Sequence, residues 1–281
     1  MNFLFDKPGV RYTRGLIGAQ FFLNLVHRRN LLAELVRRDF EQRYVGSAAG
    51  WLWGLIQPIA QLVSWTFVFQ YCLKTPMPAN GLTDNYTLYL LSGYLPWMLF
   101  QETVQRGTGS LVDNANLITK TVFPAEILPI AVFLSSLIHH GLAVGLTVAV
   151  IGVWDHHLHP LVLLLPVYAL LVGVLAIGIA WVTSALQVYL RDTAQAVMVG
   201  LNFMFWMTPI FISEEQVPAK LTFVIRMNPL TYLVRAYRER LLSENWPHLG
   251  DLAIACAYAV VVFIVGGLFF RHVKRGFADV L

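Results

Sequence analysis

Long apolar stretches without charged side chains limit the possible folds of this sequence more than any other feature. Residues 51–72, 161–190 and 194–212 contain no Asp, Glu, Lys, Arg or His. About 20 such residues cross the ~30 Å hydrocarbon core of a bilayer as a helix. Charged residues make up only 13% of the chain, about half of the ~25% typical of soluble domains. This composition predicts an integral membrane protein and excludes a soluble enzyme or a disordered scaffold.

The distribution of these stretches predicts an all-α polytopic membrane protein with six transmembrane helices. The predicted spans are residues 51–72, 86–104, 127–153, 161–188, 194–212 and 251–270. The chain then divides into an N-terminal cytoplasmic or interfacial segment (1–28), an amphipathic interface helix (29–45) and a transmembrane domain (46–281). The apolar part of the N-terminal segment is too short to span a bilayer and lacks a small-residue cleavage site after it.

The interface helix is predicted from its two-sided pattern. Its apolar side carries Leu32, Leu35, Val36 and Phe40, and its polar side carries Arg37, Arg38, Glu41 and Arg43. A helix of this kind lies along a membrane surface. The alternative is a solvated helix packed on the bundle.

The distribution of basic residues predicts the orientation. With a cytoplasmic N-terminus, the inner segments hold 14 of the 20 Lys and Arg residues and the outer segments hold 6. The positive-inside rule therefore places both termini in the cytoplasm. The formal net charge of +4 fits contact with membrane lipid headgroups, and no nucleic-acid partner is expected.

The residues within the spans argue against several functions. Gradient coupling needs charged groups inside the membrane, and the deep parts of the spans hold only His139 and His140, as a relay or as packed side chains. The chain has no GxxxxGK[ST] loop, so an ATPase would be another polypeptide. The residues Asp155, His156, His157 and His159 could ligate a metal, but a solvated turn is preferred and no metal site is predicted. Cys72 and Cys256 are expected to be small core residues.

Three spans carry polar and aromatic stripes. The first groups Trp53, Gln57, Gln61, Ser64, Trp65 and Tyr71; the second groups Tyr86, Tyr89, Trp97, Phe100 and Gln101; the fifth groups Gln195, Asn202, Trp206 and Ser213. Aromatic faces beside amides suit sugar rings, so these stripes could line a channel. Packing between helices explains them equally well. Pro58 and Pro209 are expected to kink their helices.

A pair of short helices is predicted on the outer side, at about 215–243. Asn228 can cap a helix that starts at Pro229. Its apolar face consists of Leu230, Leu233, Val234, Tyr237 and Leu241, with Arg235, Arg238, Glu239 and Arg240 mostly off that face. The segment Pro218–Met227 could form the other helix. These are either gate helices or ordinary helices whose arginines reach lipid headgroups.

From about residue 29 onward, an ordered set of motifs resembles the membrane-spanning subunits of ABC-type polysaccharide exporters. The motifs are Arg43-Tyr44-x-Gly46-Ser47 with Gly50, Leu52 and Trp53; Gly93-x-Leu95-Pro96-Trp97 with Phe100; Asn114-x-Asn116-Leu117 with Lys120, Phe123 and Pro124; Tyr189-x-Arg191-Asp192; Trp206-x-x-Pro209; Asn228-Pro229; and Gly276-Phe277-Ala278-Asp279. This family moves lipid-linked O-antigen, capsular polysaccharide or teichoic acid. The motifs are most similar to the O-antigen branch.

The resemblance implies a homodimer in a bacterial inner membrane, driven by two cytoplasmic subunits that bind ATP and magnesium, with no cofactor in this chain. By position, residues Arg37, Arg38, Arg43, Tyr44, Asn114, Asn116 and Lys120 would contact the ATPases, and Arg191 and Asp192 would cap the turn between spans four and five. Residues Asn228, Pro229, Arg235 and Arg238 would belong to the outer gate. The alternatives are a teichoic-acid exporter, a channel, and an acyl- or glycosyltransferase that uses His139 and His140 or residues 155–159.

Overall fold

The computed structural model describes residues 28–43, 45–47, 49–76, 82–120, 123–154, 160–243, 246 and 248–281. Within these ranges every regular element is helical, which confirms the all-α prediction. The α-helices are α2 (Arg29–Gln42), α3 (Trp53–Thr66), α4 (Tyr86–Asp113), α5 (Ala115–Lys120), α6 (Ile127–Trp154), α7 (Leu165–Tyr189), α8 (Thr193–Met207), α9 (Thr222–Met227), α10 (Pro229–Leu242), α11 (Leu249–Val273) and α12 (Phe277–Val280). A π-helical segment, Phe67–Cys72, extends α3.

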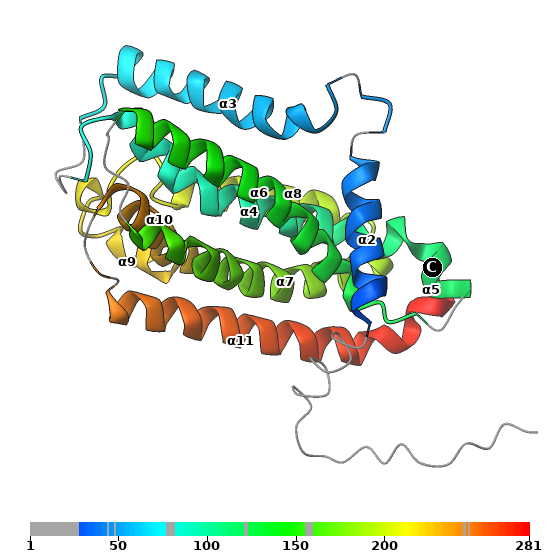
Figure 1. The fold of residues 1–281 in the computed structure, drawn as a ribbon. Helices are drawn as coiled ribbons and strands as arrows, with labels where there is room; N and C mark the ends of the chain where they lie inside the picture. Colours follow the sequence, from blue (N-terminus) through cyan, green and yellow to red (C-terminus); the bar gives the residue numbers. More distant parts are fainter. Residues whose placement is uncertain are drawn as a thin grey trace, which may run out of the picture.

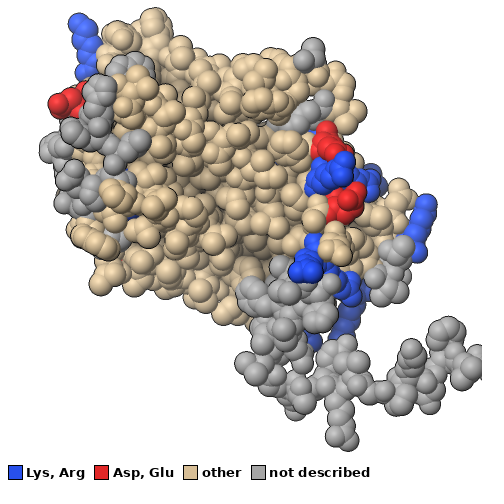
Figure 2. All heavy atoms as spheres, in the orientation of Figure 1, with Lys and Arg blue, Asp and Glu red and all other residues tan. Residues whose placement is uncertain are grey.

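The long helices run side by side, and α2 crosses them at one end of the bundle (Figure 1). This end also carries α5 and the C-terminus, and we call it the α2 end. Helices α9 and α10 lie at the opposite end, which we call the α10 end. Figure 2 shows charged side chains gathered at the two ends and a wide uncharged belt between them on the face drawn. A belt of this kind is what a bilayer requires of its protein surface.

Four described helical segments are long and apolar enough to cross a membrane: Gly50–Cys72, Ile127–Val153, Pro160–Tyr189 and Leu249–Gly276. They correspond to predicted spans one, three, four and six. The second predicted span is part of α4, which begins at Tyr86 as predicted but continues to Asp113 instead of ending at 104.

The fifth predicted span is shorter than expected. The helix α8 has 15 residues, which at ~1.5 Å per residue is about 22 Å. It ends at Met207 because Pro209 follows, and Thr208 adopts an extended backbone with ψ of 134°. A residue before proline avoids the helical region. The prediction that Pro209 kinks a helix is therefore wrong, since this proline ends one. Pro58 does lie inside α3.

The core of the bundle is built around α4, which packs against α6, α7, α8 and α10. Its N-terminus is capped by the Asn85 side chain, which accepts from the backbone N–H groups of Thr87 and Leu88. The side chains of Trp97 and Phe100 are buried. Helix α4 is thus enclosed by the other helices along most of its length.

Helix α3 stands apart from the core. Leu62 is its one buried residue among those that the structure describes, and large apolar side chains such as Trp53, Val63, Phe67 and Tyr71 are exposed. The outer side of α8 likewise exposes Phe203 and Trp206. Exposed apolar surface of this extent indicates contact with lipid or with another protein chain.

Candidate functional site

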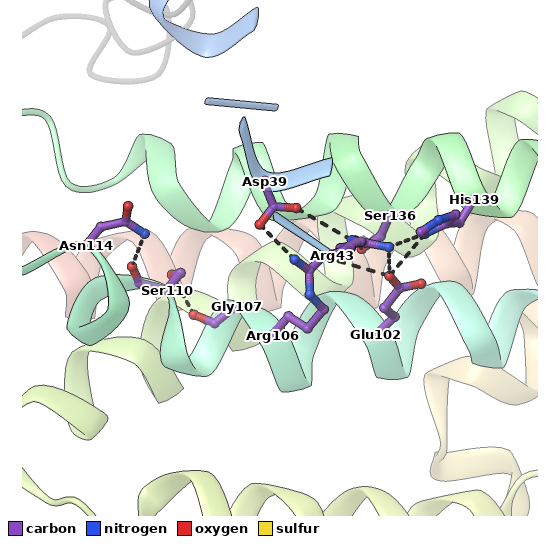
Figure 3. Close-up of polar contacts among 9 residues, drawn as sticks. All are labelled: Asp39, Arg43, Glu102, Arg106, Gly107, Ser110, Asn114, Ser136 and His139. Atoms are coloured by element: carbon purple, nitrogen blue, oxygen red, sulfur yellow. Dashed lines mark hydrogen bonds and ion pairs between the residues drawn. The ribbon is translucent and has the colours of Figure 1, made fainter. Parts of the chain in front are cut away.

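A cluster of charged side chains joins three helices at the α2 end (Figure 3). Arg43, directly after α2, forms an ion pair with Glu102 of α4 and donates to His139 Nδ1 of α6. Its Nη2 also donates to the Ser136 hydroxyl of α6 at 3.0 Å. A single guanidinium therefore contacts two helices of the bundle.

A second ion pair lies beside the first. Arg106 Nη2 of α4 donates to Asp39 Oδ1 of α2 at 2.8 Å, and Arg43 Nε lies 3.8 Å from the other Asp39 oxygen. Within α4, Arg106 is 3.9 Å from Glu102 Oε1. Two arginines thus face two carboxylates, and the four formal charges cancel. We call Asp39, Arg43, Glu102 and Arg106 the ion network.

The ion network is largely removed from solvent. The Arg43 side chain is 11% exposed and that of Glu102 is 23% exposed. Burial raises the pKa of Asp39 above its ordinary value, because a desolvated carboxylate is disfavoured, although Arg43 partly offsets this effect. Removing Arg43, the least exposed member, would leave the Glu102 carboxylate without its direct partner, which is strongly destabilising. The Arg106 side chain is more exposed, at 31%.

The predicted ATPase contacts of α2 separate into two groups. Arg37 and Arg38 are exposed, and Arg37 makes only a solvent-exposed pair with Glu41 at 2.8 Å. Arg43 instead points into the bundle, so its side chain is not available on the outer surface of α2. Tyr44 lies outside the described residues. The i, i+4 spacing of Asp39 with Arg43, and of Glu102 with Arg106, was the sequence signal for the ion network, but nothing in the sequence brought the two pairs together.

The other predicted contact residues lie around α5 and the α7–α8 turn. Asn116 and Lys120 are exposed on α5, whereas the Asn114 amide ends α4 by donating to the Ser110 carbonyl at 2.9 Å. Arg191 and Asp192 lie in the α7–α8 turn as expected, and Asp192 occupies the N-cap position of α8. The Asp192 side chain accepts no cap hydrogen bond. The Gln187 amide closes the turn instead, because its Nε2 donates to the Arg191 carbonyl and its Oε1 accepts from the Ala194 N–H.

At the α10 end, the predicted helix start is confirmed. Asn228 Oδ1 accepts from the Leu230 N–H at 3.0 Å, with Pro229 at the first helical position. The apolar face that the sequence predicted is buried in full: Leu230, Leu233, Val234, Tyr237 and Leu241. The short preceding helix is α9 (Thr222–Met227), which is shorter than the predicted segment 218–227.

The position of Arg238 differs from the prediction that the arginines of α10 lie mostly off its apolar face. Its side chain is buried and donates to the backbone carbonyls of Pro209 and Ile210 at 2.6 and 2.5 Å. The guanidinium also lies 3.7 Å from the centre of the Tyr89 ring, a cation–π contact. Arg240 is also buried and pairs with Glu239. The carbonyls around Pro209 are available because the α8 helix has ended, which the sequence pattern of α10 did not reveal.

Arg235 remains at the surface of the α10 end and ties three segments together. It pairs with Glu214 and with Asp251 at the start of α11, at 2.6 and 2.5 Å. These side chains, with Arg226 and Arg238, line part of an open cavity of about 720 Å³. Of the predicted gate residues, Arg235 and Arg238 line this polar depression, whereas Asn228 and Pro229 do not.

The aromatic and amide stripes are divided by burial. Trp53, Gln57, Gln61, Ser64, Tyr71, Asn202 and Trp206 are exposed on α3 and α8. Tyr89, Trp97 and Phe100 are buried inside the subunit, and Trp97 donates to the Gln101 side chain at 2.6 Å. Trp97 and Phe100 are therefore packed between helices of this subunit, whereas Tyr89 also borders the cavity at the α10 end. Trp65 lies between the two groups, with ring contacts to Tyr94, Phe205 and Phe211.

The two intramembrane histidines occupy packing positions. His139 belongs to the surroundings of the ion network, and His140 Nε2 lies 2.9 Å from the buried Tyr237 hydroxyl. The described residues hold no group of three potential metal ligands. The cluster at 155–159 lies outside the described residues.

The comparisons with known proteins all match proteins that are named for transport or export. The family model described as ABC-2 type transporter matches residues 30–242. An O-antigen export system permease protein RfbA of Klebsiella pneumoniae is 28% identical over 263 residues, 92% of this chain and 97% of that protein. A protein of the same name from Myxococcus xanthus is 26% identical over 260 residues, 91% of this chain and 96% of that protein. The polysialic acid transport protein KpsM of Escherichia coli is 20% identical over 239 residues, 84% of this chain and 91% of that protein.

Proposed function

The chain belongs to the ABC-2 type transporter membrane family, and on this premise we propose that it is the permease subunit of an ATP-driven polysaccharide exporter. Its cargo would be a lipid-linked O-antigen or capsular polysaccharide, moved outward across a bacterial inner membrane. The observation that carries the proposal is the nearly full-length match to permeases named for O-antigen export.

The energy source follows from what the chain contains. It supplies membrane-spanning helices but no GxxxxGK[ST] loop, so a partner would bind ATP and magnesium. We propose two copies of that partner on the α2 end, which would be cytoplasmic together with both termini. The exposed Arg37, Arg38, Asn116 and Lys120 lie at this end and would be the first contacts.

The exposed helices suggest how the channel is completed. We propose that two copies of the chain associate through α3 and α8, since their apolar faces are not covered by the subunit itself. The exposed stripe residues on these helices would then border the passage for sugar: Trp53, Gln57, Gln61, Ser64, Tyr71, Asn202 and Trp206. Amide groups and flat aromatic faces match the hydroxyl edges and apolar faces of sugars.

Among the polysaccharide classes, O-antigen is favoured. The relatives named for O-antigen export are 26–28% identical, whereas the relative named for polysialic acid transport is 20% identical. None of these three relatives is named for teichoic acid, so that alternative loses support.

The test is affinity purification of the full chain from native membranes in mild detergent, followed by identification and stoichiometry of its partners. We expect an ATP-binding subunit in a two-to-two ratio, with ATPase activity in the preparation. Deletion of the gene for this chain is expected to remove surface polysaccharide while the glycan accumulates inside the cell. A homogeneous chain that emerges alone from several detergents, with unchanged surface polysaccharide in the deletion strain, would contradict the proposal.

A further inference from the structure

Apolar contacts attach α2 only weakly to the bundle. Leu35 is its one buried residue among those described. Leu31, Leu32 and Val36 are partly buried against the core, and the Phe40 ring contacts that of His139. Because hydrophobic stabilisation scales with buried apolar area, this small contact is a limited attachment. The ion network at the C-terminal end of α2 supplies the directional contacts to α4 and α6.

The chain that follows α2 leads to α3 and not to the core helices. The chain turns through Gly46 and Gly50, which have φ angles of 78° and 51°. These left-handed conformations suit glycine and break the helical path before α3. Helix α3 itself is barely packed on the bundle. A displacement of α2 therefore reaches the core through side chains: it packs against α6, and two ion pairs join it to α4.

Helix α4 also contacts the α10 end through buried groups. From Glu102 back to Tyr89 is one continuous helix, and 13 residues at ~1.5 Å each span roughly 20 Å. At its far end, Arg238 of α10 lies over the Tyr89 ring and against Gly93. A Cβ atom at Gly93 would lie 2.5 Å from Arg238 Nη2, so the glycine makes room for the guanidinium.

Resting on the proposed function, we propose that the ion network is the joint through which ATP-driven movement of α2 displaces α4. In the same proposal, α4 carries the movement to α10 through Arg238. Asp39, Arg43, Glu102 and Arg106 are then positioning residues, which touch neither the nucleotide nor the cargo. Desolvated ion pairs suit this task because they add little net stability over apolar packing, whereas separating them is costly. Their bonds also fix one geometry.

The experiment uses the full complex in proteoliposomes and cells of the native host, with Arg106→Met as the principal variant. Methionine keeps an unbranched side chain and removes the charge that faces Asp39. Lys274→Met is the matched control, because Lys274 forms an ion pair with Glu126 at 2.5 Å that does not involve α2. Arg106→Lys tests rescue by a retained charge.

Three quantities are measured in each variant: ATP hydrolysis, surface polysaccharide, and the nucleotide-dependent signal of a fluorophore at the α10 end. The fluorophore is attached at Met227→Cys, an exposed position on α9, after replacement of the free Cys72 and Cys256. The amount of folded, assembled complex is recorded for every variant.

In Arg106→Met we expect hydrolysis within about twofold of the parent, but about tenfold less export per ATP, the factor that matches loss of one charge-assisted hydrogen bond. The fluorophore signal should disappear, whereas Lys274→Met should keep all three quantities and Arg106→Lys should recover most of them. Unchanged export and signal in Arg106→Met would overturn the inference. A parallel fall of hydrolysis, export and folded complex would also overturn it, since the network would then only hold the fold. A parent chain without an ATPase partner would instead contradict the proposed function.

Discussion

At the scale of single residues, Arg238 is the clearest case of a side chain whose role depends on its surroundings. It donates to the carbonyls of Pro209 and Ile210 and stacks on Tyr89. The planar guanidinium therefore makes two directed hydrogen bonds and a contact with an aromatic face at the same time. Lysine has no planar group of this kind. A positive charge alone would not replace this side chain.

We therefore predict that Arg238→Lys lowers the stability of the purified chain by about 2 kcal/mol, because a carbonyl loses its donor in a buried site. Thermal unfolding in detergent, followed by the fraction that stays monodisperse, measures the effect. Arg226→Lys is the matched control on the exposed surface of the neighbouring α9. An equal change in the two variants would show that the two hydrogen bonds from the Arg238 guanidinium contribute nothing to stability.

The raised pKa of Asp39 predicts how the stability of an Asp39 variant depends on pH. Its pKa is raised in the folded protein, chiefly by burial, so the folded state binds this proton more tightly than the unfolded state does. The stabilising contribution of the protonated form is complete below the ordinary Asp pKa, and it is lost as the pH rises through the raised value. Asp39→Asn cannot titrate. The stability deficit of this variant relative to wild type should therefore be largest in acid and should shrink as the pH rises. Thermal unfolding across the acidic range checks this, and a deficit that grows with pH would contradict it.

At the scale of elements, small residues decide how closely α7 and α11 approach. A side chain at Gly266 of α11 would overlap the backbone of Gly178 in α7. Close approach of this kind is a common way for helices to associate in a membrane, where the hydrophobic effect gives no drive for helix–helix contact. Gly145 of α6 offers the contrast, since an added Cβ there would meet nothing within 4 Å.

The expected result is that Gly266→Ala destabilises the chain by about 1–3 kcal/mol through overpacking. Gly145→Ala should be neutral or slightly stabilising, by up to about 1 kcal/mol, because alanine is the better helix former. The yield of folded protein and its unfolding temperature distinguish the two. If Gly145→Ala proved the more damaging variant, the close contact between α7 and α11 would not control packing.

At the scale of the whole molecule, some helices are enclosed by the subunit and others expose large apolar surfaces. Helices α4, α6 and α7 form the core, whereas α3, the outer side of α8 and much of α11 remain exposed. This arrangement supports the proposal that a second copy completes the transport path. It also limits the lining residues to those that the subunit leaves on its surface.

Gln61 tests this limit, since it is exposed on α3 and belongs to the polar stripe. If the stripe lines the passage, Gln61→Leu removes an amide that can bond sugar hydroxyls and should reduce surface polysaccharide about tenfold, the equivalent of one or two hydrogen bonds. Val63→Leu, on the same exposed helix, is the control and should have no effect. Normal polysaccharide in a folded Gln61→Leu variant would remove this residue from the lining.

The sequence alone determined the class of protein, most of the helices and the start of α10. These depend on local properties: apolar length for the spans, and an asparagine followed by proline for the cap at Asn228. Local patterns also placed five apolar residues of α10 on one face, and all of them are buried. The sequence-based prediction misplaced the ends of α4 and α8. The thickness of a bilayer does not determine how far a mostly buried helix continues beyond the membrane, or whether a proline ends a helix or lies within it.

Only the tertiary structure decided which polar groups meet. The pairs Asp39–Arg106 and Arg43–Glu102 join residues that are more than 50 positions apart, and Arg238 bonds carbonyls that become available where α8 ends. The tertiary structure also separated the aromatic stripe of α4, which is buried, from those of α3 and α8, which are exposed. A sequence pattern reports which side chains share one helical face, but burial and charge pairing depend on what packs against that face, and that is a property of the assembled bundle.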